Sequence, residues 1–154
     1  MNLLAETPFE NSLGFDLSFS SVKDGFVKIF VSGELAAQSR DRRIFLRING
    51  VTSSYQSFTL MNGHAGAGEW DTSGIYLGRN GWNLDSNFLS EIKLGIFSKS
   101  QKITANGLTT FALGDNRILG YEHHGFLVTS SPLSSISVGF DSGVASGKSS
   151  VYVM

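Results

Sequence analysis

The sequence has no cysteine among its 154 residues. Disulfide bonds and cysteine-ligated metals are therefore excluded. The chain also lacks Asn-X-Ser/Thr glycosylation sites, and it lacks an early basic-then-apolar run of the kind that marks a signal peptide. No apolar run approaches the roughly 18 residues of a membrane span. We therefore expect no membrane partner, and synthesis in a cytoplasm.

Charge is also scarce. Charged residues make up 16% of the chain, below the usual quarter or so, and the formal net charge is −1. This composition offers no basic face, so we expect no nucleic-acid partner. Hydrophobic residues reach 41%, with 12 phenylalanines, and that content is typical of one globular domain with a real core.

What the sequence has in abundance is alternation of apolar and polar residues. Leu13, Phe15, Leu17 and Phe19 alternate with small or polar residues, which is the period of a half-buried strand. Asn49–Gly50 and Asn106–Gly107 are turn signals between strands. Further candidate strands cover residues 26–31, 44–48, 75–77, 88–97, 108–113, 117–128, 133–140 and 149–154.

No stretch shows a capped apolar repeat of 3.6 residues. The sequence therefore predicts an all-β protein, an antiparallel β-sandwich or jelly roll of roughly eight to ten strands. A single domain is expected over residues 13–154. Residues 1–12 fall outside the alternation and are interpreted as an N-terminal arm, in which Pro8 favours an extended chain. Because exposed Leu3, Leu4 and Phe9 would be costly, we expect the arm to be buried against a partner surface or the chain itself.

Two stretches approach known catalytic or nucleotide-binding motifs and fail on context. Gly143 to Ser149 resembles a phosphate-binding loop, but three residues separate its glycines instead of four, and the chain after it predicts a strand instead of a helix. Ser90 and Lys93 match a Ser-x-x-Lys motif, which needs a helix to bring the two side chains to one face. We therefore predict no cofactor and no catalytic residue.

Histidines and carboxylates give two weak candidates. His123 and His124 are adjacent in a predicted strand, so they point to opposite faces and do not readily share a metal ion. His64 lies in a predicted loop. Glu69 and Asp71 flank Trp70. Such a cluster suits a sugar-binding rim or a glycosidase carboxylate pair, although an ordinary loop around a buried tryptophan is also compatible with it.

A second group of residues is predicted to contact a ligand or a partner. Trp70, Trp82, Tyr55 and Tyr76 are the aromatic residues that we expect in loops, where they could form a glycan platform or a protein interface. Arg40, Arg42 and Arg43 surround Asp41 and form the chain's only basic cluster. This cluster is either a solvated loop or a salt-bridge patch for a partner.

Three short motifs together resemble a known class of protein. Leu46-Arg47-Ile48-Asn49-Gly50 leads into Ser53-Ser54-Tyr55, the 92–94 strand precedes a Ser/Lys/Thr-rich loop, and the chain ends in Ser146 to Val153. This pattern resembles the β-sandwich domains of tailed-phage virion surface proteins, which include fibre heads and capsid decoration proteins. The ending Val153-Met154 departs from the glycine often seen there.

The resemblance implies a non-enzymatic virion protein, most simply a trimeric capsid decoration protein made in the host cytoplasm. Its partners would be two further copies of the chain and the major capsid protein or another virion protein, with Leu3, Leu4 and Phe9 as the docking arm, and a host surface glycan is a further candidate partner. Alternatives are the receptor-binding head of a tail or head fibre, and a free carbohydrate-binding module that uses Trp70 and Trp82.

Overall fold

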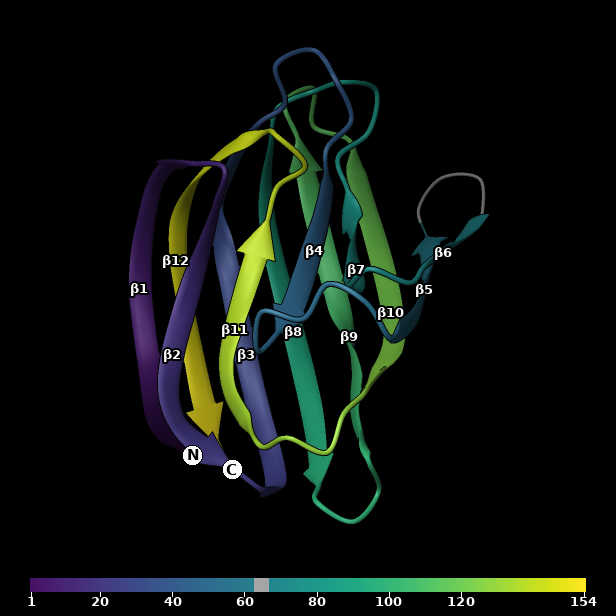
Figure 1. The fold of residues 1–154 in the computed structure, drawn as a ribbon. Coiled ribbons are helices and arrows are strands. Elements are labelled where there is room, and N and C mark those ends of the chain that lie inside the picture. Colours follow the sequence, from purple (N-terminus) through teal and green to yellow (C-terminus); the bar gives the residue numbers. More distant parts are fainter. Residues whose placement is uncertain (63–66) are drawn as a thin grey trace.

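The structure is a computed structural model that describes residues 1–62 and 67–154. It confirms the antiparallel β-sandwich (Figure 1). The larger sheet has the order β1-β12-β3-β8-β9-β10-β5-β6 and contains β1 (Asn2–Ser12), β12 (Val144–Val153), β3 (Asp24–Ala36), β8 (Ser86–Phe97), β9 (Lys102–Leu113), β10 (Ile118–Val128), β5 (Tyr55–Asn62) and β6 (Ala67–Asp71). The smaller sheet has the order β2-β11-β4-β7 and contains β2 (Gly14–Val22), β11 (Leu133–Gly139), β4 (Arg43–Ile48) and β7 (Ile75–Arg79).

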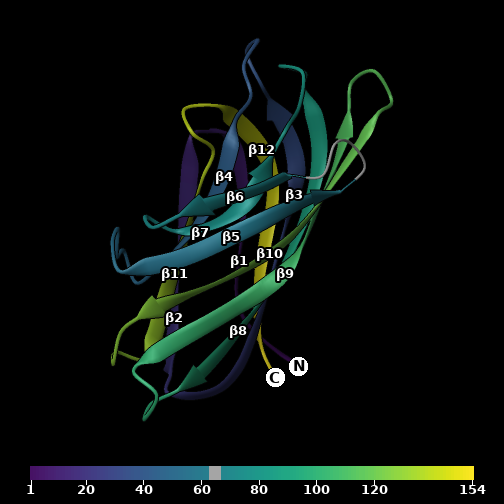
Figure 2. The ribbon, with the colours of Figure 1, turned by 90° about the vertical axis from the view of Figure 1, so that its right-hand side faces the viewer.

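The core lies between the two sheets, and the predicted alternation decides which side chains enter it. Ile44, Leu46 and Ile48 of β4 are fully buried, and so are Ile92 and Leu94 of β8. Their polar neighbours on the same strands point away from the core because successive side chains in a strand face opposite sides. In the larger sheet, β8, β9, β10 and β5 run side by side (Figure 2).

The strand β1 replaces the predicted arm. Residues 2–12 pair with β12 over almost their whole length and form one edge of the larger sheet. Phe9 is buried and stacks on Phe15 at 4.6 Å between ring centroids, Leu4 packs against the core, and Leu3 is exposed. The interpretation as a separate arm was wrong because the register of β1 shifts twice, and such irregularities remove the strict period of two.

The sequence predicted that Asn106–Gly107 is a turn between two strands, and this prediction was wrong. The dipeptide lies inside β9, and the turn falls earlier, at residues 98–101. Glycine is needed at position 107 because an added Cβ would lie 1.9 Å from the Glu91 carbonyl oxygen and 2.6 Å from His123 Cε1. β5 and β6 were also missed, so the described residues hold more strands than expected.

The stretch that approaches a phosphate-binding loop is a turn followed by a strand. Gly143 donates a hydrogen bond to the Phe140 carbonyl at 2.9 Å, and β12 then runs from Val144 to Val153. The backbone amides from Ala145 onward belong to the ladders with β1 and β3. Their use in sheet pairing leaves no helix N-terminus for a phosphate.

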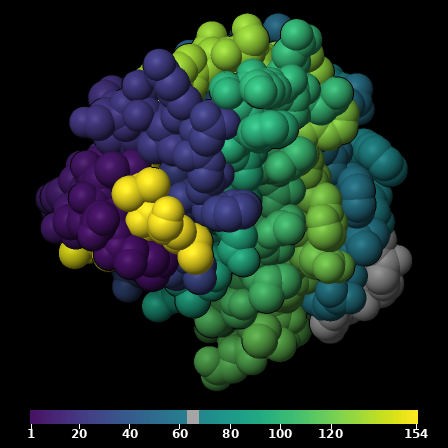
Figure 3. All heavy atoms as spheres, turned by 90° about the horizontal axis from the view of Figure 1, so that it is seen from below, coloured from purple at the N-terminus to yellow at the C-terminus, as the bar shows by residue number. Residues whose placement is uncertain are grey.

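The chain ends meet at one end of the sandwich. Asn2 lies opposite Val153, and the space-filling view from below shows the first and last residues side by side (Figure 3). In the described part of the chain, no helix has the length and apolar character needed to cross a membrane.

Candidate ligand-binding face

The larger sheet has one face on the core and one face open to solvent. On the open face, the pairing register aligns one outward residue from each of seven neighbouring strands. We call this set the outer row, and it consists of Trp70, Phe58, His124, Asn106, Lys93, Lys28 and Tyr152, in the order β6, β5, β10, β9, β8, β3 and β12. The row crosses the strands at right angles, so it brings together residues from distant parts of the sequence.

Three rings at the β6 end of the outer row form a continuous aromatic cluster. Phe58 lies 5.0 Å from Trp70 and 5.1 Å from His124 between ring centroids, and the Phe58–His124 pair is stacked. Trp70 is 70% exposed, the largest value among the exposed large hydrophobic residues of the described chain. A ring of this size in water is costly unless something covers it.

Polar groups adjoin the aromatic cluster. His124 Nε2 lies 3.4 Å from Glu122 Oε1, and both side chains are on the open face of β10. Asn106 follows His124 in the outer row on the neighbouring strand β9. An apolar surface with a few convergent donors and acceptors is the usual composition of a small-ligand site.

Glu69 and Asp71 are two residues apart in β6, so they point to the same side of the strand, and that side is opposite to Trp70. Arg43 lies between the two carboxylates, with Nη2 3.6 Å from Glu69 Oε2 and Nη1 3.6 Å from Asp71 Oδ2. Arg79 Nε also contacts Glu69, at 3.1 Å. The two acids therefore anchor arginines instead of facing an open substrate groove.

The basic cluster is dispersed by the fold. Arg42 is buried, and its guanidinium donates to the carbonyls of Ala37 at 2.8 Å and Asp141 at 3.1 Å. Arg43 lies over the Tyr76 ring, 4.1 Å from its centroid. Only Arg40 of the three stays exposed. The expected partner patch was wrong for Arg42 and Arg43, because carbonyls and carboxylates of this chain already engage them.

Tyr55 and Tyr76 were expected in loops, and that expectation was also wrong. Tyr55 is 1% exposed at the start of β5, and its hydroxyl accepts a hydrogen bond from the Ile48 amide and donates one to the Val51 carbonyl, both at 2.8 Å. Tyr76 is fully buried in β7. Burial raises the pKa of both phenols above the ordinary value. Neither ring can contact a glycan.

Tyr55 also explains one of the motifs that resemble virion proteins. Asn49 and Gly50 turn the chain with φ values of 52° and 70°, and the Tyr55 hydroxyl ties the two sides of that turn together. Asn49 Oδ1 accepts from the Ser134 amide at 2.8 Å. The motif therefore builds a corner of the sandwich.

Trp82 lies in a small hollow away from the outer row. The guanidinium carbon of Arg117 is 3.5 Å from the centre of the Trp82 ring, and the indole is 38% exposed. The hollow measures about 260 Å³ and includes Asp41 and Arg79, whose side chains pair at 2.7 Å. Arg117 covers one face of the ring, so Trp82 presents less open aromatic surface than Trp70.

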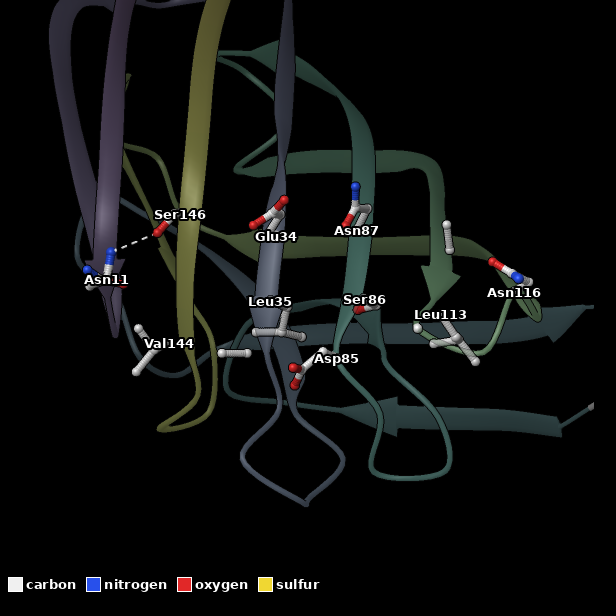
Figure 4. Close-up of a pocket in the computed structure, with 13 residues that line it drawn as sticks. Asn11, Glu34, Leu35, Asp85, Ser86, Asn87, Leu113, Asn116, Val144 and Ser146 are labelled. Atoms are coloured by element: carbon white, nitrogen blue, oxygen red, sulfur yellow. Dashed lines mark hydrogen bonds between the residues drawn. The ribbon is translucent and has the colours of Figure 1, made fainter.

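A polar cleft of about 470 Å³ opens where β3 ends and β8 begins (Figure 4). Glu34 and Asn87 stand next to each other there, and Asp85 accepts a hydrogen bond from the Ala37 amide at 2.8 Å. None of the residues that line the cleft is aromatic. The cleft therefore lacks the stacking surface that distinguishes the aromatic cluster.

Strand geometry decides which side chains of the remaining motifs are buried and which are exposed. His123 is fully buried while His124 faces solvent, as predicted for adjacent strand residues. Burial, with a smaller contribution from His124, lowers the pKa of His123 to about 4.

Ser90 is buried, with its hydroxyl 2.7 Å from that of Thr109, whereas Lys93 is exposed. His64 lies outside the described residues, which contain no group of three or more metal-ligating side chains.

Sequence reasoning named Trp70 but missed its partners in the outer row. Phe58 carried no signal of its own, and His124 was considered as a metal ligand or as a polar surface or interface histidine. The alternation on β5 and β10 does place both residues on the open face. Which strands are neighbours could not be read from the sequence.

No family model and no curated protein matches this sequence. Among solved structures, the fold is similar to toad ovary galectin in complex with thio-digalactose, with 9% identity, 92% of this chain and 99% of that chain covered, and a TM-score of 0.40. It is also similar to CG-16, a homodimeric agglutinin from chicken liver, with 10% identity, coverage of 92% and 96%, and a TM-score of 0.36. A C2 domain protein from Ramazzottius varieornatus has a TM-score of 0.23. Similarity at these levels assigns no function to the chain.

Proposed function

We propose that this chain is a non-enzymatic glycan-binding domain, and that its ligand lies on the open face of the larger sheet against Trp70, Phe58 and His124. The observation that carries the proposal is the contiguous aromatic cluster with an exposed indole. A sugar ring has one face of C–H groups and a rim of hydroxyls, so it matches an aromatic plane bordered by hydrogen-bonding side chains.

The neighbouring polar residues supply that border. Glu122 accepts hydrogen bonds from hydroxyls, and Asn106 both donates and accepts. The contact between Glu122 and His124 orients the imidazole against Phe58. Because these groups stand on adjacent strands of one sheet, the surface is largely formed before a ligand arrives, which reduces the ordering cost of binding.

Binding to a glycan array, followed by calorimetry on the best oligosaccharide, tests the proposal. Trp70→Ala should weaken binding by about tenfold or more, because it removes the largest exposed stacking surface. Ile118→Ala is the matched control, since Ile118 is exposed at the far end of β10, on the strand that carries His124. Absence of any glycan binding by the unaltered chain would refute the function, and equal affinities for the unaltered chain and Trp70→Ala would refute the site.

A location on a phage particle remains a prediction of the sequence resemblance. Its support is the three motifs of the resemblance: the Leu46 to Tyr55 stretch, the 92–94 strand with the loop after it, and the closing strand. Mass spectrometry of purified phage particles tests whether the chain is present in them, and a labelled antibody against the chain tests where on the particle it lies. Detection only in the unassembled fraction of a lysate would contradict it.

A further inference from the structure

Lys93 extends the outer row beyond the aromatic cluster. It stands on the open face of β8 between the buried side chains of Ile92 and Leu94. Asn106 is its partner on β9, and His124 is the next residue in the row, on β10. Neighbouring strands lie about 4.8 Å apart, so Lys93 and His124 are separated by about 10 Å across the sheet.

The charge of Lys93 is not balanced within the described part of the chain. Its partner on β3 is Lys28, a second ammonium directly opposite, which is an unfavourable arrangement. Lys28 is engaged by Glu91 at 2.8 Å and lies over the Phe30 ring at 5.4 Å. Among the described residues, Lys93 takes part in no ion pair.

We propose that the bound glycan carries a carboxylate, and that Lys93 pairs with it while the aromatic cluster holds an uncharged part of the same chain. This inference rests on the glycan-binding function proposed above. One sugar unit cannot reach both groups across about 10 Å, so the ligand is an oligosaccharide that runs across the strands along the outer row. Asn106 lies between the two contacts and offers its amide to the intervening hydroxyls.

The surrounding charges favour a sparsely charged glycan over a nucleic acid or another dense polyanion. Glu122 and Glu91 stand on the same open face, two residues along β10 and β8 from His124 and Lys93, the partners of Asn106 and Lys28. The formal net charge of the chain is −1. A polymer with an anion on every unit would meet both carboxylates, whereas one carboxylate placed at Lys93 would adjoin only Glu91, which is already paired with Lys28.

The test is an array of oligosaccharides of two to six sugars, in which each acidic member is printed as the free acid and as its methyl ester, next to uncharged members. The ester removes the charge and keeps the shape. The unaltered chain should prefer the acid by about two- to fivefold, the range of an exposed ion pair. The preference should vanish in Lys93→Gln, reverse in Lys93→Glu, and persist in Lys99→Gln, which alters an exposed lysine in the 98–101 turn.

The outcomes separate the two proposals. Equal binding of acid and ester by the unaltered chain overturns the carboxylate inference and leaves glycan binding in place. A preference that survives in Lys93→Gln also overturns it, because another cation would then be responsible. No binding to any printed glycan overturns both proposals. Tight binding to single-stranded DNA in the same buffer would replace the glycan with a nucleic acid.

Discussion

Tyr55 shows how one hydroxyl can hold a corner of the sandwich. Its ring is buried, and its oxygen satisfies both the Ile48 amide and the Val51 carbonyl. In Tyr55→Phe these buried groups lose their partner, so we expect the free energy of unfolding to fall by about 1–3 kcal/mol. Urea unfolding measures this. Tyr152→Phe is the control, because Tyr152 is half-buried and its ring contacts Phe30 edge to face. An equal effect of both changes would contradict the role of Tyr55.

His123 predicts a dependence of stability on pH. The unfolded chain binds a proton at this side chain near pH 6.5, whereas the folded chain binds it only near pH 4. The folded state should therefore lose about 3 kcal/mol progressively as the pH falls through this interval, and none of it above the interval. Thermal unfolding of the unaltered chain and of His123→Leu between pH 7.5 and 4 checks this. Parallel curves for the two proteins would contradict it.

At the scale of elements, the close approach of β12 to β3 depends on Gly147. An added Cβ there would lie 2.0 Å from the Ser32 carbonyl oxygen, so the two strands would have to separate. We expect Gly147→Ala to destabilise the fold by about 1–3 kcal/mol. Lys148→Ala, which removes an exposed ion pair with Glu6, should cost at most about 1 kcal/mol. Chemical denaturation of both variants measures this difference, and equal losses of stability would contradict the packing role of Gly147.

Strands with a strict apolar–polar alternation could be predicted together with their buried faces, whereas strands without it were missed or had residues misplaced. β4 and β8 place every second residue in the core, so their sequences show the period of two. β7 is buried on both sides over Ile75 to Gly78, which leaves no alternation and led to the misplacement of Tyr76. β1 is interrupted by register shifts. In these elements, tertiary contacts decide the structure and the local pattern carries little of the information.

At the scale of the whole molecule, the candidate site depends on strand order. Phe58 belongs to β5 and His124 to β10, and their contact exists because β10 pairs with both β5 and β9. For the strands that were predicted, the alternation gives the face on which each side chain lies, but many strand orders are compatible with it, and β5 and β6 were not predicted as strands. Trp70 could therefore be named from the sequence, whereas the outer row required the fold.

The assembly state is the last prediction, and it also belongs to the whole molecule. Phe26 and Phe97 are 57% and 59% exposed on the open face, where they border a hollow whose floor includes Gly95. Two exposed phenylalanines in one patch favour a protein interface, and the resemblance to virion proteins predicts a homotrimer. Light scattering should give about three times the chain mass of 16.6 kDa at micromolar concentration.

The double change Phe26→Ser with Phe97→Ser should yield monomers, because it removes the apolar area that association would bury. Leu89→Ser, which alters an exposed residue elsewhere on β8, should leave the trimer intact. A monomer mass for the unaltered chain would contradict the prediction, and a trimer that survives the double change would place the interface on another surface.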